Sequence, residues 1–494
     1  MKKLLLICAW IIGWIVPCFA QQSLRLSLDD AIALANDSSL TAFRYRNMYW
    51  AGYWEFRTFQ ADRLPAISMN VAPRYLRYIT NRYDSGMDRD VYREQQLFGA
   101  DGYFSLTQNV DFLGGTFYMN SELGYMRNFG YSKSTQFSAV PLQVGYKQNL
   151  LGYNAFRWDK RIEPLKYEKT RKQFVYHMES ISEEVAKLYF DLAMAQANCT
   201  LAQSNVVSSD TLYAIGERRF RIASISQADL LTLKLDKVNA ENTLRNAIIA
   251  RKRAMTALGN YLHIGQGTEI ETLLPEHPAE LFIPADKALA LVGENNPLFL
   301  DHQQRILEAE RTLDKTIKES RMNASFNASI GFNQVADNLG GAYRNLLQQD
   351  LVQLSVSVPL VDWGIRKGKK NMARNNLEEV RLSARQEEIS LEEDVMVTVD
   401  EFNIQQTQIA NAREAYNLAE VAYEQTQQRF FIGKMTVADL TLASNRRQEA
   451  QRNYILALQE YWQNYYKIRR MTLYDFEHGE PLTNRFNFNT GMYK

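Results

Sequence analysis

The chain has 494 residues and is close to neutral, with 57 basic and 56 acidic side chains. Residues 1–20 combine two early lysines, an apolar run from Leu4 to Val16 and a small-residue cleavage site at Ala20, which predicts a secretory signal peptide. Cleavage near Gln21 leaves 55 basic against 56 acidic side chains. This balance excludes a general nucleic-acid-binding surface, which would need an excess of basic residues.

Cysteine content and hydropathy narrow the class further. Of the three cysteines only Cys199 survives removal of the signal, which excludes an intramolecular disulfide, so packing must stabilise the fold. Acylation of Cys18 as a lipoprotein stays open as an alternative, although Pro17 immediately before it argues against this. No later run of about 18 apolar residues predicts a transmembrane helix, so a role in a membrane would have to use β-strands.

Two stretches 210 residues apart are near copies: residues 219–230 (RFRIASISQADL) and 429–440 (RFFIGKMTVADL). Each is typical of a helix end, a short turn and a new helix whose first residues include a hydroxyl cap and an acid. We therefore predict that each is the tip of a helical hairpin. Further matches upstream predict that the chain duplicates one unit of helix, strand, strand, long helix and helix.

The duplication predicts the division of the mature chain. The predicted parts are a first repeat at 21–258 (strands within about 63–150, hairpin about 155–258), a linker at 259–284, a second repeat at 285–472 (strands about 323–361, hairpin about 365–471) and a tail at 473–494.

Apolar residues recur every seven positions along both long helical stretches. The columns are Val185, Leu192, Cys199, Val206, Tyr213 and Phe220 in the first repeat, and Val395, Phe402, Ile409, Tyr416, Tyr423 and Phe430 in the second. A heptad step sustained this far predicts a left-handed supercoil. The long helices, at about 155–222 and 365–432, would each span about 100 Å. Shorter helices are expected at about 28–62, 227–258, 285–320 and 437–471.

Segments of alternating hydrophobicity predict strands in both repeats. In the second repeat they are residues 325–332 and 352–358, and in the first 65–78 and 141–149, with further runs at 103–110 and 116–126. Ten of the 27 tyrosines fall between Tyr75 and Tyr153, and tyrosine favours membrane interfaces. Four or six strands are too few to close a membrane barrel, so a barrel would have to be shared between copies.

The sequence offers no catalytic, metal or cofactor site. Its five histidines form no metal-ligand pair at helical spacing, and no nucleophile elbow or phosphate loop is present. His177 lies on a charged helix and is expected to be solvated. The protein is therefore predicted not to be an enzyme.

Together these features resemble the TolC-like outer-membrane efflux proteins, also called outer membrane factors. The residues that carry the resemblance are the two hairpin tips and Val358-Pro359-Leu360-Val361-Asp362-Trp363-Gly364, which is similar to the strand exit of that family. The repeated Ala-Ile/Leu-Ala-Leu at 31–34 and 288–291, followed by Asn295-Asn296-Pro297, also fits. The resemblance covers nearly the whole mature chain.

The resemblance implies a mostly α-helical homotrimer in the outer membrane, with a shared β-barrel continued into a long periplasmic α-helical barrel. Partners would be outer-membrane lipid, a periplasmic adaptor and an inner-membrane transporter, and the linker and the tail would lie round the middle of the helical tunnel. The tips would form the periplasmic aperture and contact the adaptor. The residues that it implies there are Arg219, Ser226, Asp229, Arg429, Gly433, Lys434, Thr436 and Asp439.

Within this interpretation Asp439 and Asp229 form a carboxylate ring that favours cations, or alternatively only stabilise the helix that follows. Arg219, Arg429 and Lys434 supply ionic ties that close the mouth. Ala223 stands where the family has a turn glycine, which weakens the assignment of the first tip to the aperture. The duct serves either small-molecule efflux or type I protein secretion. A soluble periplasmic coiled-coil scaffold is the remaining alternative, and the path of residues 81–136 stays open.

Overall fold

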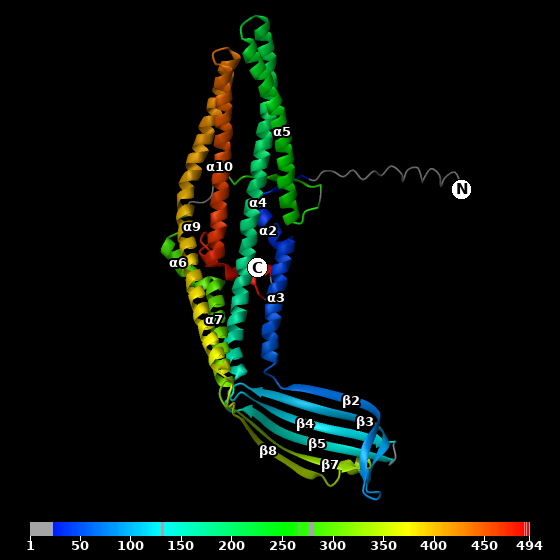
Figure 1. Ribbon diagram of the computed structural model, residues 1–494. Coiled ribbons are helices and arrows are strands. Elements are labelled where there is room, and N and C mark those ends of the chain that lie inside the picture. Colours follow the sequence, from blue (N-terminus) through cyan, green and yellow to red (C-terminus); the bar gives the residue numbers. More distant parts are fainter. Residues whose placement is uncertain are drawn as a thin grey trace, which may run out of the picture. The chain divides into compact units, whose positions relative to one another are not determined.

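The computed structural model describes residues 23–129, 133–265, 267–275, 281–488, 490 and 492–493. The predicted signal peptide, Cys18 and the cleavage site near Gln21 lie outside the described residues. Figure 1 shows long helices and one large sheet. By its internal contacts the chain divides into two units: residues up to 49, 171–296 and from 390 onward form the first, and residues 50–170 and 297–389 the second.

The two long helices are present where the heptad columns predict them. They are α4 (Ala155–Arg221) and α9 (Ile365–Phe431), each of 67 residues, which corresponds to a length of about 100 Å. Each is followed by a shorter helix, α5 (Gln227–Tyr261) or α10 (Val437–Thr472). In the part of the chain that the structure describes, no helix combines the length and the apolar character needed to cross a membrane.

The heptad columns differ in burial between the two hairpins. In α9 the column is buried at Val395, Phe402 and Ile409, and again at Phe430 beside the turn, which is 3% exposed. In α4 it is buried at the start, but Phe220 beside the first turn is 41% exposed. The second tip therefore has a packed apolar core that the equivalent position of the first tip lacks.

Two shorter helices that the sequence predicts as continuous are each broken in two, so both predictions are wrong in this respect. The first consists of α2 (Leu28–Ser38) and α3 (Leu40–Ala61), and the second of α6 (Ala285–Asn295) and α7 (Pro297–Glu319). Ser39 at the first break caps α3, because its hydroxyl accepts from the amide of Ala42. Pro297 holds the residue before it in an extended conformation.

The second unit contains a six-stranded antiparallel sheet. Its strands are β2 (Ala66–Asp84), β3 (Arg89–Val110), β4 (Gly115–Asn128), β5 (Ser134–Asn149), β7 (Asn323–Ala336) and β8 (Leu347–Ser357), in the order β2-β3-β4-β5-β7-β8. They lie side by side in Figure 1. Helix α8 (Leu339–Ala342) lies in the β7–β8 connection. The described part of residues 81–136, whose path the sequence left open, belongs mainly to β3 and β4 inside this sheet.

The first unit also contains small sheets that tie its loops to the helices. Strand β1 (Ser23–Leu26) pairs in parallel with β6 (Glu269–Thr272), and the hydroxyl of Tyr189 on α4 donates to the carbonyl of Leu26 at 3.0 Å. The C-terminal segment forms β9 (Tyr474–Asp475) with β10 (Glu480–Pro481), a 3-10 helix η1 (Leu482–Arg485), and β11 (Phe486–Asn487) with β12 (Met492–Tyr493).

Candidate functional site: hairpin tips and strand sheet

The second hairpin tip ends its long helix with two closing hydrogen bonds. The amide of Gly433 donates to the carbonyl of Phe430, and the amide of Lys434 donates to the carbonyl of Arg429, both at 2.9 Å. This pattern is a Schellman motif, in which the residue at the bend takes a left-handed conformation. Gly433 occupies that position with φ of 78°, which a glycine adopts without a steric penalty.

The first tip makes the same turn without a glycine. The amide of Ala223 donates to the carbonyl of Phe220 at 2.9 Å, and the amide of Ser224 donates to the carbonyl of Arg219 at 2.8 Å. Ala223 has φ of 56°, a conformation that costs an ordinary residue about 1–2 kcal/mol. Alanine in place of the turn glycine that the resemblance implies therefore leaves the turn geometry unchanged and adds backbone strain.

Both tips start their second helix with a capping box. The hydroxyl of Thr436 accepts from the amide of Asp439 at 3.2 Å, and the Asp439 carboxylate accepts from the amide of Thr436 at 3.0 Å. Ser226 and Asp229 repeat these bonds at 3.1 Å each. Hydrogen bonds from the side chain and backbone of the capping residue lower the pKa of both carboxyl groups. Both acids thus have the capping role that the sequence left as an alternative, while their side chains stay exposed.

Arg219 on the first hairpin contacts the second. Its guanidinium lies over the ring of Phe430, 5.4 Å from the ring centre, and one amino group donates to the Phe430 carbonyl at 3.4 Å. Leu212, also on the first hairpin, packs against the buried cluster of Tyr423, Phe430 and Leu440. The first hairpin therefore covers part of the apolar core of the second tip.

An arginine that the sequence analysis missed lies further from the turn on α10. The Arg447 side chain is 8% exposed, and its guanidinium lies 3.9 Å from the ring centre of Tyr423. It donates to the Glu420 carboxylate at 3.3 Å, while its Nε and Nη2 have no hydrogen-bond partner among the described residues. Arg447 therefore joins the two helices of the second hairpin. Of the residues in this contact, only Tyr423 could have been identified from the sequence, because it belongs to the heptad column of α9.

A polar cavity of about 270 Å³ lies between the helices of the two hairpins. Helices α4, α5, α9 and α10 all contribute to its wall, and burial raises the pKa of Asp236 on α5. Its polar lining residues are Asn205, Ser208, Ser209, Asp236, Asn239, Thr243, Thr441, Ser444, Asn445 and Gln448. The two hairpins are therefore joined by apolar contacts near Phe430, and a polar cavity separates their helices further from the turns.

Arg429 and Lys434 have exposed side chains at the second tip. Within the described residues of this single chain, neither these two side chains nor Arg219 forms an ion pair, and Arg219 instead contacts a carbonyl and an aromatic ring. The ionic ties between tips stay a prediction, because they would involve other copies of the chain.

The sheet has one apolar and one polar face, which its register shows directly. Strand pairing places Ile67, Leu106, Met119, Val144 and Ile330 in one row across five strands, and this row ends at Asp350 on the edge strand β8. The adjacent row contains Ser68, Ser105, Asn120 and Gln143, in which the hydroxyl of Ser105 donates to Asn120 at 2.8 Å. Neighbouring rows point to opposite faces of a sheet, so one surface suits lipid and the other suits water.

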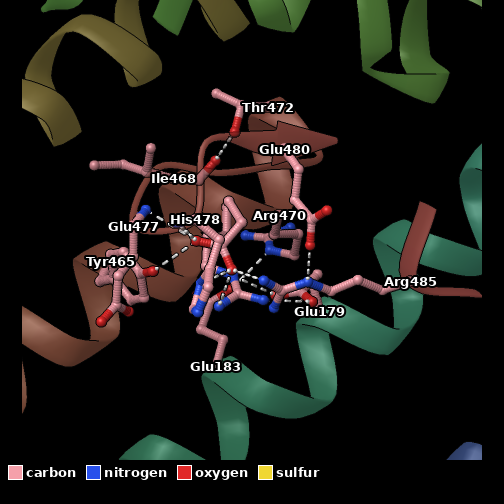
Figure 2. Close-up of polar contacts among 12 residues, drawn as sticks. Glu179, Glu183, Tyr465, Ile468, Arg470, Thr472, Glu477, His478, Glu480 and Arg485 are labelled. Carbon is pink, nitrogen blue, oxygen red and sulfur yellow. Dashed lines mark hydrogen bonds and ion pairs between the residues drawn. The ribbon is translucent and has the colours of Figure 1, made fainter. Parts of the chain in front are cut away.

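A network of buried charges joins the C-terminal segment to the helices (Figure 2). The Asp475 carboxylate is fully buried and forms ion pairs with Arg485 at 2.8 Å and with Arg469 on α10 at 3.5 Å. Arg469 also pairs with the buried Glu179 on α4 at 3.2 Å, and Arg470 pairs with Glu183 at 2.7 Å. The network holds the tail against α4 and α10. No sequence motif had indicated that these charged residues pair with one another.

Asp475, Glu477 and His478 are close enough to suggest a metal site. However, Asp475 already binds two arginines and the amides of Glu477 and His478. Burial alone would raise the pKa of Asp475, but the opposing effects, of which Arg469 is the largest, lower it. A carboxylate compensated by two guanidinium groups is a poor ligand for a cation, so the group is structural.

His177 is partly buried rather than fully solvated, so the prediction for it holds only in part. Its ring stacks on Tyr45 on α3 with the ring centres 4.4 Å apart, and burial lowers its pKa. An aromatic neighbour on another helix is not visible in the charged local sequence.

The comparisons with known proteins agree with this geometry. Residues 292–472 match the family model described as outer membrane efflux protein. Among solved structures, the CmeC outer membrane channel of Campylobacter jejuni matches with a TM-score of 0.65 and 12% identity, over 94% of this chain and 88% of that one. The outer membrane protein VceC of Vibrio cholerae matches with a TM-score of 0.62 and 14% identity, over 90% and 95%.

The open state of the MtrE outer membrane channel of Neisseria gonorrhoeae matches with a TM-score of 0.58 and 13% identity, over 90% of this chain and 88% of that one. No curated protein sequence matches the chain. The matched family and structures are membrane channels and efflux proteins rather than enzymes. Residues 292–472 are therefore similar to the outer membrane efflux protein family, and along most of its length the chain has the fold of solved outer-membrane channels.

Proposed function

We propose that the protein is the outer-membrane duct of an efflux system, through which small molecules pass without chemical change. The observation that carries this proposal is the combination of a two-faced sheet with two 67-residue helices in one chain, of which residues 292–472 match the outer membrane efflux protein family. A sheet with one apolar and one polar face suits a membrane barrel around a water-filled lumen. Helices of this length suit a tunnel across the periplasm.

In this proposal three copies share one barrel in the outer membrane, because six strands in one chain are fewer than a membrane barrel needs. The helices of the three copies form the periplasmic tunnel. The two hairpin tips face a periplasmic adaptor, which connects the duct to an inner-membrane transporter. The transporter supplies the energy, and the duct supplies a continuous aqueous path.

The tips are the proposed aperture. The exposed carboxylates of Asp229 and Asp439 from three copies would form rings at the mouth, where negative charge concentrates cations. Gly433 and Lys434 at the turn of the second tip would lie against the adaptor, together with Arg429 at the end of α9. Arg219 would hold the two tips of one copy together through Phe430.

The proposal is tested by removing the gene and restoring it on a plasmid. We expect the protein in detergent extracts of the outer membrane as a trimer that dissociates on heating, and we expect the deletion strain to retain dyes and drugs that the restored strain exports. If high salt extracts the protein and it is recovered as a monomer in the periplasmic fraction, the result would contradict the duct and favour a soluble scaffold.

Type I protein secretion is the second candidate, since the family resemblance that suggests an efflux duct fits this role equally well. The two functions are separated by comparing the secreted proteins of the deletion and the restored strains. Loss of a secreted protein with unchanged dye export would replace efflux by secretion and leave the trimeric duct in place.

A further inference from the structure

We infer that β3 and β4 belong to the wall of the barrel that the proposed function assigns to three copies, so that this barrel has eighteen strands and closes through the β2 and β8 edges. The number of copies rests on the proposed function, whereas the edges and the strand number per copy come from the sheet itself. The sheet order begins with β2 and ends with β8, and neither has a second strand partner among the described residues.

Both edge strands have the properties of strands that pair with another chain. Every residue of β8 is exposed, including Val352 at 77% and Leu354 at 63%, and β2 exposes Ile67 at 63% and Met69 at 69%. Long exposed edges bind other strands unless something covers them, and in lipid the unpaired backbone groups of an open edge are not tolerated. Neither edge pairs with the other in the described chain, so the occupant must come from outside it.

Strand direction identifies that occupant as a second copy. Five antiparallel pairings separate β2 from β8, so the two edges run in opposite directions. The β2 edge of one copy can therefore continue the antiparallel ladder of β8 in the next. The contact repeats from copy to copy and closes into a ring, as a head-to-tail interface does when the rotation allows it.

The register of the sheet fits closure at the tilt that barrels adopt. The row of paired residues that starts at Ala66 on β2 reaches Leu351 on β8. Ser357, the last residue of β8, lies six positions beyond that row. If the next copy places Ala66 opposite Ser357, each copy contributes a shear of six residues, which corresponds to a strand tilt of about 35°.

A shear of eight residues for each copy corresponds to a tilt of about 43°, whereas four or ten residues correspond to about 25° or 49°. Barrel strands tilt by about 35–45°, so among even shears only six and eight fit, and an odd shear would join the apolar face of one copy to the polar face of the next. Both keep the faces continuous, because residues directly opposite one another lie on the same face. Ser68 and Asn70 of β2 then lie opposite polar residues of β8, such as Ser355.

Eighteen strands make a wide outlet. At these tilts and strand spacings the barrel has a backbone diameter of about 36 Å, against about 24 Å for the twelve strands that would remain if β3 and β4 lay outside it. The strand barrel then leaves an aqueous channel of porin width. The narrowest point of the duct, and therefore its selection of cargo by size, would lie at the hairpin tips.

Cysteine cross-linking in native outer membranes tests the inference. In a Cys199→Ser background we pair Ser355→Cys with Ser68→Cys for the six-residue shear, and with Asn70→Cys for the eight-residue shear. We expect covalent dimers and trimers under non-reducing conditions after heating in one of the two registers. Ile67→Cys with Ser355→Cys is the matched control, whose cysteines point to opposite faces and should not link.

A fourth pair, Ser68→Cys with Gln143→Cys, tests the twelve-strand arrangement. These residues lie in one row but are separated by β3 and β4, about 14 Å apart and beyond the reach of a disulfide. A disulfide within one chain at this pair would mean that β2 and β5 lie side by side, and it would overturn the eighteen-strand barrel. Unlinked β2–β8 pairs in variants that still run as heat-sensitive trimers overturn the edge contact. Failure of the Cys199→Ser parent to form trimers contradicts the proposed function instead.

Discussion

At the scale of single residues, Gly433 and Ala223 hold the same left-handed turn at different cost. An added Cβ at Gly433 would meet only the end of the Arg219 side chain, at 3.6 Å. Gly433→Ala should therefore reduce the stability of the turn mainly through the strain of a left-handed φ, by about 1 kcal/mol. We expect faster amide hydrogen exchange at the second tip of the purified trimer. Ala223→Gly is the matched control: relief of strain offsets the greater freedom of the unfolded chain, so exchange at the first tip should change little.

The two acids of the tips make a separate prediction about ion selectivity. Asp439→Asn removes the charge, whereas Thr436→Ala removes the capping hydroxyl and keeps the charge. If the carboxylates ring the aperture, reversal potentials of channels in planar bilayers should show less cation selectivity for Asp439→Asn and normal selectivity for Thr436→Ala. Equal loss in both variants would assign Asp439 a capping role alone.

The hydrogen bonds of the capping box also set the pH range of this selectivity. They lower the pKa of Asp439 from its ordinary value near 3.8, so the carboxylate stays ionised throughout neutral and mildly acidic conditions. Its contribution to the helix start is fully present above the pKa of the unfolded chain and is lost only as the pH falls through the lower folded value. Cation selectivity should therefore be the same at pH 7 and pH 5. A decline between these values would show that neighbouring copies raise the pKa.

At the scale of elements, the C-terminal segment depends on one buried carboxylate. Asp475→Asn removes the buried carboxylate that Arg469 and Arg485 share and leaves them only Glu179 and Glu480, respectively, so we expect a loss of no more than about 3 kcal/mol. We expect limited proteolysis to cleave the segment after α10 while the strand sheet stays protected. Glu480→Gln is the control: Glu480 pairs with the same Arg485 from an exposed position, so the effect should be below about 1 kcal/mol.

How far the elements follow from sequence depends on whether local residues decide them. The ends of α4 and α9 are predicted closely, because a heptad column, a left-handed turn position and a capping box coincide there. The break before Pro297 had a local signal, Asn296-Pro297, which the single helix expected at about 285–320 did not take into account. The duplication itself stays a prediction.

Strand order and buried charge could not be predicted, since they depend on distant partners. Alternation indicates which residues share a face, but it does not say whether β3 and β4 lie inside the sheet or beside it. The contacts of Arg469 and Arg447 could not be predicted either, because only the fold brings Asp475 and Tyr423 close to them. At the tips the caps were visible in sequence, whereas the contact of Arg219 with Phe430 was not.

At the scale of the whole molecule, a duct works only if its tips fit an adaptor, and the turn of the second tip offers a way to separate fit from folding. Gly433→Glu and Gly433→Ala impose the same backbone strain, because both place a side chain at φ of 78°. Only the glutamate adds bulk and charge to the exposed surface. Any difference between them therefore reports on what the tip contacts.

We expect both variants to form heat-sensitive trimers in the outer membrane, because the turn is remote in sequence from every strand of the sheet. Gly433→Glu should lose dye export and should no longer co-purify with its adaptor after cross-linking in cells, while Gly433→Ala keeps most of both. Normal export by Gly433→Glu would contradict an adaptor contact at this turn. Equal loss in both variants would mean that the conformation of the tip, rather than its surface, limits coupling.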